Sequence, residues 1–149
     1  MNKKQLEDLL IQVAAGDLSV EQAQKNLEHL DYQNIDFANI DHHRSLRKGF
    51  PEVLFGEGKT SQQIIGIMEK MIPNENIILA TRVDKNKADQ ILPSFENVRY
   101  FEDAKLLRYQ AKPPVITGIG TILIVSAGTS DIPVAREAAL TAAAMGNTV

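Results

Sequence analysis

The feature that most restricts the fold is the alternation of helical and strand patterns in the middle of the chain. Thr60 and Gln63 form a capping box, and the apolar residues that follow it recur at helical spacing. Residues 76–83 (NIILATRV) form an apolar run of strand length, and residues 97–103 (NVRYFED) predict a second strand after a short helix. Strand, helix and strand in so short a stretch predict a compact parallel α/β unit, and residues 106–109 add a further strand or turn.

The start of the chain has two helical patterns. Apolar residues recur at helical spacing over residues 6–13, and Gly16 follows them as an expected C-cap. Ser19 and Gln22 form a second capping box that opens the next helix. Residues 1–30 therefore predict a helical hairpin, which is too short to bury a core alone and is expected to dock on another part of the protein or on another subunit.

The end of the chain predicts one strand and one helix after a linker. Residues 111–118 contain two prolines and a glycine and lack periodicity, as linkers do. Residues 122–125 form a continuous apolar run, typical of a parallel strand that is covered on both faces. Pro133 suits the first turn of a helix that Gly146 closes. Because one strand and one helix cannot form a doubly wound sheet, we expect the sequence to continue into a larger domain.

The predicted class is therefore α/β, with a helical hairpin and a small α/β domain followed by the start of a three-layer, Rossmann-like domain. The predicted segments are the hairpin (1–30), the small α/β domain (31–110), the linker (111–118) and the first strand–helix unit of the next domain (119–149).

Composition excludes several classes of function. Among 149 residues, 44% are hydrophobic and 23% are charged, which is typical of soluble globular proteins. The net charge of −3 argues against a general nucleic-acid binder. The absence of cysteine excludes disulfides, cysteine zinc sites and a cysteine nucleophile within these residues. The sequence shows no signal peptide and no apolar run of about 18 residues, so we expect a cytoplasmic protein without a membrane partner.

The strongest chemical signal is the stretch SAGTSD between the predicted last strand and its helix. Ligands of open α/β sheets bind at the carboxyl ends of strands, and a helix N-terminus offers backbone N–H groups to phosphate. Hydroxyl donors, a small residue and an acceptor for a ribose hydroxyl come together here: Ser126, Gly128, Thr129, Ser130 and Asp131. The same residue types also cap helices routinely. The spacing alone is equally consistent with a ligand site and with capping.

A second candidate is the basic stretch of residues 41–60 (DHHRSLRKGFPEVLFGEGKT). Its ending, Gly58-Lys59-Thr60, matches the end of a phosphate-binding P-loop. The first glycine of that motif should stand where the chain has Val53. We therefore reject a P-loop.

The cations of this stretch could still hold a phosphate or carboxylate, and the helix that Thr60 opens would add N–H donors. These cations are Arg44, Arg47, Lys48 and Lys59. A solvated basic loop is the alternative, and charge counting alone favours it. The histidines at positions 42 and 43 would point to opposite faces of a strand, so no metal site is predicted.

Two stretches together resemble the LarB family, which opens the biosynthesis of the nickel-pincer nucleotide cofactor. They are residues 41–60 and residues 122–147 (ILIVSAGTSDIPVAREAALTAAAMGN), and the resemblance extends over nearly the whole chain. The C-terminal domain of that family is similar to the PurE-type aminoimidazole ribonucleotide carboxylases, which carry a G-S-x-S-D turn. Ser130 and Asp131 match the end of that turn, but alanine and glycine stand at 127 and 128. This departure weakens the case for a purine substrate.

The resemblance implies a reaction on nicotinic acid adenine dinucleotide. The family carboxylates the pyridinium ring with carbon dioxide or bicarbonate and hydrolyses the phosphoanhydride, which gives pyridinium-3,5-biscarboxylic acid mononucleotide and AMP. The family's nucleophilic cysteine lies in the C-terminal half, so we expect it after Val149 and expect these residues alone not to turn over. No covalent cofactor is expected, a divalent metal is left open, and the resemblance implies a homo-octamer.

The resemblance also implies that the basic stretch recognises anionic groups of the nucleotide. The expected binding residues there are Arg44, Lys48, Glu52, Lys59 and Thr60, with Glu52 orienting one of the cations. Two other readings stay open: a PurE-type carboxylase or mutase of purine biosynthesis, and a non-catalytic nucleotide-binding module.

Overall fold

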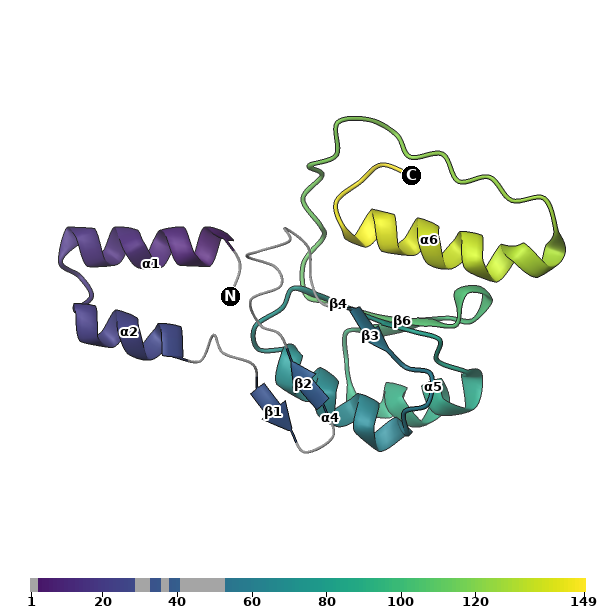
Figure 1. The fold of residues 1–149 in the computed structure, drawn as a ribbon, viewed down its shortest axis with the longest axis horizontal. Coiled ribbons are helices and arrows are strands. Elements are labelled where there is room, and N and C mark those ends of the chain that lie inside the picture. Colours follow the sequence, from purple (N-terminus) through teal and green to yellow (C-terminus); the bar gives the residue numbers. More distant parts are fainter. Residues whose placement is uncertain (1–2, 29–32, 36–37, 41–52) are drawn as a thin grey trace.

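The computed structural model describes residues 3–28, 33–35, 38–40 and 53–149 (Figure 1). A helical hairpin precedes a four-stranded mixed sheet with helices on both faces, which confirms the predicted α/β class. The helices are α1 (Lys3–Ala15), α2 (Val20–Glu28), α4 (Ser61–Met71), α5 (Lys85–Ile91) and α6 (Ile132–Ala144), with short 3-10 turns η1 (Leu92–Ser94), η2 (Glu102–Ala104) and η3 (Thr129–Asp131). The strands are β1 (Gln33–Ile35), β2 (Ala38–Ile40), β3 (Val53–Phe55), β4 (Ile77–Thr81), β5 (Val98–Phe101) and β6 (Leu106–Gln110). No helix in these ranges is both long and apolar enough to cross a membrane.

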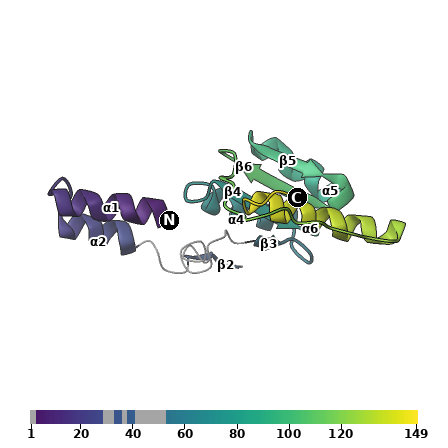
Figure 2. The same cartoon turned by 90° about the horizontal axis from the view of Figure 1, so that it is seen from above.

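The hairpin of α1 and α2 follows the sequence pattern. Gly16 ends the first helix with a φ of 80°, a conformation that glycine adopts without strain. The N–H of Gln22 donates to Ser19 Oγ at 3.2 Å and the N–H of Ser19 donates to Gln22 Oε1 at 3.3 Å, which is the predicted capping box. In both ribbon views the hairpin lies to one side of the sheet (Figures 1 and 2). The two helices are confirmed as elements, and their status as a separate domain stays a prediction.

The sheet has the strand order β3-β4-β6-β5. β3 pairs in parallel with β4, whereas β6 is antiparallel to both of its neighbours. The predicted parallel unit is therefore only partly right, because β4 and β5 run in the same direction but β6 lies between them. The cause is the short turn η2 and Lys105, whose φ of 48° reverses the chain at once. A tight turn joins antiparallel neighbours, so β6 runs back along β5, and in this structure its other edge pairs with β4.

Helices α4 and α5 cover one face of the sheet. Ile64 and Met68 of α4 and Ile91 of α5 are fully buried, and they form one cluster with Ile78 of β4 and Leu107 of β6. Their spacing on α4 is the helical spacing of the sequence pattern, so the predicted buried helix is confirmed.

Helix α6 covers the opposite face of the sheet. Leu140 and Ala144 pack with Leu79 of β4 and Leu106 of β6 in a second cluster. Figure 1 shows α6 on one side of the strands and α4 and α5 on the other. The predicted helix after Pro133 is confirmed, and within the described part of the chain it completes three layers, helix on sheet on helix.

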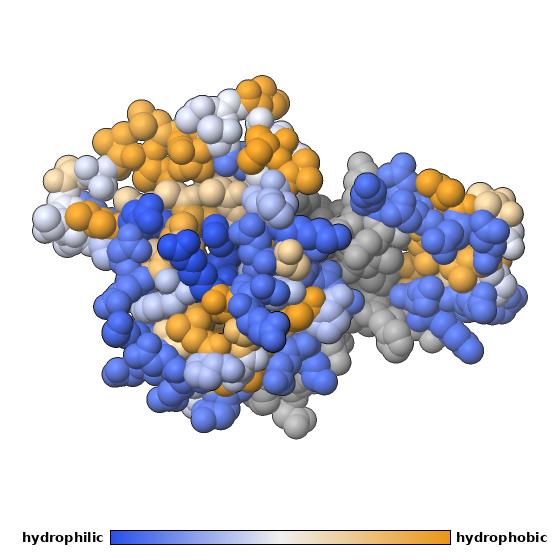
Figure 3. Space-filling model, turned by 180° about the vertical axis from the view of Figure 1, so that it is seen from behind, coloured by the Kyte–Doolittle hydropathy of each residue, from blue (hydrophilic) through white to orange (hydrophobic). Residues whose placement is uncertain are grey.

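The segment before α6 differs from the prediction. Residues 122–125 were expected to form a buried strand, but they form none, and the side chains of Leu123 and Val125 are 83% and 81% exposed. The pairing found nearby is the isolated parallel bridge between Thr121 and Thr148. A parallel strand is held by hydrogen bonds to a neighbouring strand and is normally covered on both faces, and the described residues supply this segment with a single bridge. Figure 3 shows the apolar side chains gathered over this part of the surface.

Candidate nucleotide-binding site

The predicted ligand turn lies immediately before α6. Thr129–Asp131 form η3, and the N–H of Ile132 donates to the carbonyl of Thr129. Ser126, Thr129, Ser130 and Asp131 are exposed, and Gly128 is half-buried. The structure therefore presents the predicted hydroxyl and carboxylate groups to solvent at a helix start.

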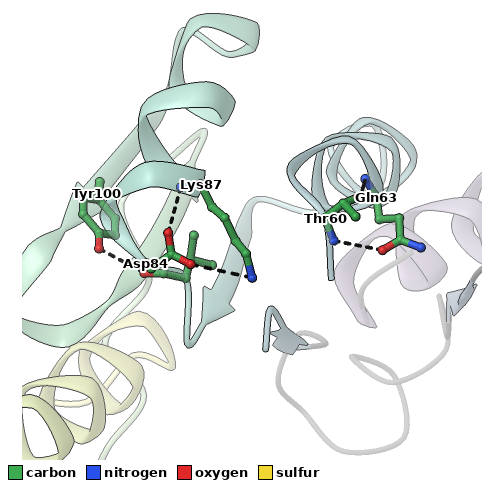
Figure 4. Close-up of polar contacts among 6 residues, drawn as sticks. Thr60, Gln63, Asp84, Lys87 and Tyr100 are labelled. Carbon is green, nitrogen blue, oxygen red and sulfur yellow. Dashed lines mark hydrogen bonds and ion pairs between the residues drawn. The ribbon is translucent and has the colours of Figure 1, made fainter. Parts of the chain in front are cut away.

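The start of α6 differs from the starts of the other two helices that pack on the sheet. At α4, Thr60 Oγ1 accepts from the N–H of Gln63 at 3.2 Å. At α5, Asp84 Oδ1 accepts from the N–H of Lys87 at 3.0 Å, and Figure 4 shows both caps. At α6, the N-cap residue Asp131 makes no side-chain capping bond. Of these three helices, α6 is thus the one whose first turn is not closed by its own N-cap side chain. The N–H of Asp131 donates to the carbonyl of Gly128, the N–H of Ile132 donates to that of Thr129, and Pro133 has no N–H, so backbone donors for an anion would come from Thr129 and Ser130 in η3.

The turn itself is compact. Ser130 Oγ lies 3.5 Å from Asp131 Oδ1. A Cβ added at Gly128 would stand 3.2 Å from Asp131 Oδ2 and 3.4 Å from Ser130 Oγ. Gly128 has an ordinary φ of −114°, so the constraint there is space and not backbone conformation. A side chain at position 128 would crowd the two groups predicted to bind the ligand.

Two ion pairs attach α6 to the sheet behind this turn. Arg136 Nε lies 2.6 Å from Asp103 Oδ2, and Arg82 Nε lies 3.3 Å from Glu137 Oε2. Exposed ion pairs contribute little energy, typically about 0–1 kcal/mol each. They join α6 to Asp103 of η2 and to the residue after β4, while the buried Leu140 packs on the sheet.

Arg82 was not among the predicted site residues. It follows β4 directly, and its φ of 57° is unusual for a residue other than glycine. Because β3 and β4 are parallel, their carboxyl ends meet at one edge of the sheet, the usual location of ligands in α/β folds. The sequence signal was available, since a cation that directly follows a buried strand lies at such an edge.

The basic stretch is described only from residue 53 onward. Lys59 and Thr60 follow β3 at the same edge, but the N–H of Thr60 donates to Gln63 Oε1 at 2.9 Å while its hydroxyl caps α4. Thr60 therefore has a structural role, and the capping box that the sequence predicted is confirmed. Arg44, Lys48 and Glu52 lie outside the described residues.

Among the described residues, the parts of the two predicted anion sites lie on opposite faces of the sheet. Thr60 opens α4 on one face of the sheet, and the turn of residues 126–131 opens α6 on the opposite face. Arg82 is the cation between them, since it follows β4 and pairs with Glu137 of α6. A shared site is not formed by the described residues.

Two titratable side chains near this edge, Asp84 and Tyr100, make structural hydrogen bonds. The N–H of Lys87 holds the pKa of Asp84 below its ordinary value. Burial raises the pKa of Tyr100, whose hydroxyl donates to the carbonyl of Val83 at 3.0 Å (Figure 4). No group of three or more histidine, cysteine or acidic residues that could hold a metal ion occurs in the described ranges.

Comparison with known proteins shows the family to which this chain is similar. A family model described as the LarB/PurE-like N-terminal domain matches residues 32–112. The chain is also 35% identical over 150 residues to the uncharacterized protein MJ0165 of Methanocaldococcus jannaschii. That alignment covers 96% of this chain and 58% of the relative, so the chain spans little more than half of the relative's length.

Proposed function

The chain belongs to the family described as the LarB/PurE-like N-terminal domain, and from this premise we propose that the whole protein carboxylates nicotinic acid adenine dinucleotide. The products would be pyridinium-3,5-biscarboxylic acid mononucleotide and AMP. The family match over residues 32–112 carries the proposal, because it supports a link to carboxylase-type enzymes. The uncapped start of α6 supports it independently, because both the substrate and the products contain phosphate.

The chemistry requires a nucleophile. A pyridinium ring is electron-poor and attacks carbon dioxide only after a nucleophile has added to it and given an enamine-like intermediate. The enamine carbon then forms its bond to carbon dioxide and loses its proton to a base, and the electrons of that C–H bond restore the pyridinium ring as the nucleophile leaves the neighbouring carbon. Water separately attacks one phosphorus of the diphosphate, and the bridging P–O bond breaks. These 149 residues contain no cysteine, so under this proposal a thiol nucleophile comes from outside them.

The residues of this chain would bind and orient the dinucleotide. The backbone N–H groups and the hydroxyls of Thr129 and Ser130, in the turn before α6, would donate to a phosphate. Asp131 would repel a phosphate that came close to it, so its carboxylate is better suited to accept from a ribose hydroxyl. Lys59 and Arg82, at the carboxyl ends of β3 and β4, would attract the anionic substrate to this edge.

The remaining parts of the proposal follow from the family. Carbon dioxide or bicarbonate would be the co-substrate, and the protein would act in the cytoplasm as a homo-oligomer. Arg44, Lys48 and Glu52 would complete recognition of the anionic groups.

The test is turnover of nicotinic acid adenine dinucleotide by the whole protein, with carboxylation followed by incorporation of labelled bicarbonate and AMP release measured separately. Lys59→Ala should lower kcat/KM because it removes a positive charge that attracts the substrate. Arg44→Lys should also lower kcat/KM, because a lysine cannot reproduce the planar fork of arginine. Lys70→Ala, at the exposed end of α4, is the matched control and should keep the wild-type rate. Absence of both products under conditions in which the protein is folded would refute the proposal.

Ser130 and Asp131 also match the end of the PurE-type turn, so the same assay should include aminoimidazole ribonucleotide. Turnover of that substrate in place of the dinucleotide would assign a purine-type carboxylase. Binding of the dinucleotide without any turnover would leave a nucleotide-binding module.

A further inference from the structure

The α6 face of the sheet carries two arginines at directly opposed positions. Arg99 of β5 and Arg108 of β6 are partners in the strand register. Both guanidinium groups lie over one aromatic ring, each with its Cζ 5.0 Å from the centroid of Phe101. Side chains of opposed residues in an antiparallel pair lie close together, so the two cations and the ring form one cluster.

This cluster is not neutralised by the residues that the structure describes. The ion pairs found among them use the cations Arg82, Lys85, Lys87 and Arg136, and none uses Arg99 or Arg108. Like charges placed directly opposite each other destabilise a sheet. Burial, with the neighbouring Arg99, lowers the pKa of Arg108. Attraction of each guanidinium group to the ring of Phe101 opposes this repulsion.

We propose that Arg99 and Arg108 form a binding site for an oxyanion group, a phosphate or a carboxylate, on the β5–β6 edge of the sheet. The ring positions both guanidinium groups, and each retains N–H donors that match the spacing of two anionic oxygens. An oxyanion between them removes the repulsion that the unbound pair carries. Arg99 is exposed and β5 is the edge strand, so a ligand can approach the pair from solvent. This site is distinct from the turn before α6 and does not depend on the proposed reaction.

The test is a titration of the isotope-labelled protein at constant ionic strength, with the Nε–H signals of the arginines followed by NMR. Inorganic phosphate and acetate serve as separate probes, and chloride serves as the reference. The signals of Arg99 and Arg108 should shift in a saturable manner with phosphate, acetate or both, and the tighter probe identifies the group that the site prefers. Arg99→Gln and Arg108→Gln should each weaken binding at least tenfold, and Arg108→Lys should weaken it by a smaller factor.

Two controls separate this site from others. Lys70→Gln removes one charge from α4, on the opposite face of the sheet, and should leave the dissociation constant unchanged. Ser130→Ala changes the turn before α6 and should also leave the dissociation constant of the arginine pair unchanged. The result for the arginine pair is therefore independent of whether the proposed function is correct. Arg99 is exposed, so its variant should fold even if the Arg108 variant does not. Non-saturable shifts, or equal affinity in the wild type and Arg99→Gln, would overturn the proposal and leave the pair as surface packing around Phe101.

Discussion

Replacing Gly56 with alanine tests how β3 is held against β4. The N–H of Gly56 donates to the carbonyl of Thr81 at 2.8 Å, immediately beyond the parallel pairing of the two strands. A Cβ at position 56 would stand 2.7 Å from Val83 Cγ2 and 2.8 Å from that same carbonyl oxygen. The backbone cannot move away from the oxygen without lengthening the hydrogen bond, so the contact cannot relax cheaply.

The expected loss of stability follows from these two contacts. Overpacking of a well-packed site costs about 1–3 kcal/mol, and weakening the hydrogen bond adds about 0.5–1.5 kcal/mol. We therefore expect Gly56→Ala to lower the free energy of unfolding by about 2–4 kcal/mol, measured by urea denaturation with unchanged m-value. The melting temperature should fall by about 4–16 °C, because each kcal/mol corresponds to about 2–4 °C in a protein of this size.

Gly120→Ala is the matched control for this substitution. A Cβ at position 120 meets nothing within 4 Å, and this glycine has no positive φ. The control should change the free energy of unfolding by less than about 0.5 kcal/mol. Equal, small effects of both substitutions would refute the argument that Gly56 is required for the close approach of β3 to β4.

Two further predictions concern α6 and the cap of α5. Leu140→Ala should lower the free energy of unfolding, measured by urea denaturation, by about 2–4 kcal/mol, because Leu140 packs in the cluster between α6 and the sheet. Leu123→Ala, at an 83% exposed position, is the control and should lower it by less than about 0.5 kcal/mol. Similar losses in the two variants would show that α6 does not cover the sheet. The pKa of Asp84 is lowered in the folded state, so its contribution to stability is present above the unfolded pKa of about 3.9 and is lost as the pH falls through the lower folded value. Asp84→Asn keeps a capping oxygen and should flatten the acid limb of stability against pH below about pH 4.5, and an unchanged acid limb would contradict the assigned cap.

Local structure was predictable from the sequence because its causes are local. The capping boxes that begin at Ser19 and Thr60 need only residues three positions apart, and both occur in the structure. Helix α6 is specified by Pro133 in its first turn and Gly146 after its end, and the buried strand β4 by its apolar run.

Pairing and placement were not predictable, because they depend on distant parts of the chain. The antiparallel turn from β5 to β6 includes the left-handed conformation at Lys105, a residue type that gives no such signal, and the placement of β6 beside β4 depends on pairing with a distant strand. The apolar run of residues 122–125 is typical of a strand, but a strand forms only where partners exist. The same limit applies to the candidate site: the hydroxyl-rich turn was visible in the sequence, whereas the position of Arg82 beside α6 required the fold.

Under the proposed function, the turn before α6 binds a phosphate-containing ligand at a helix start that has no side-chain cap. The test is calorimetric titration of nicotinic acid adenine dinucleotide into the whole protein, with Ser130→Ala and Asp131→Asn as variants. Hydrogen bonds to charged groups contribute about 1.5–3 kcal/mol, so Ser130→Ala should weaken binding at least tenfold, and both variants should keep the wild-type melting temperature. Wild-type affinity in both variants, or a loss of melting temperature that accounts for the weaker binding, would contradict the claim and assign these residues to the structure of the turn.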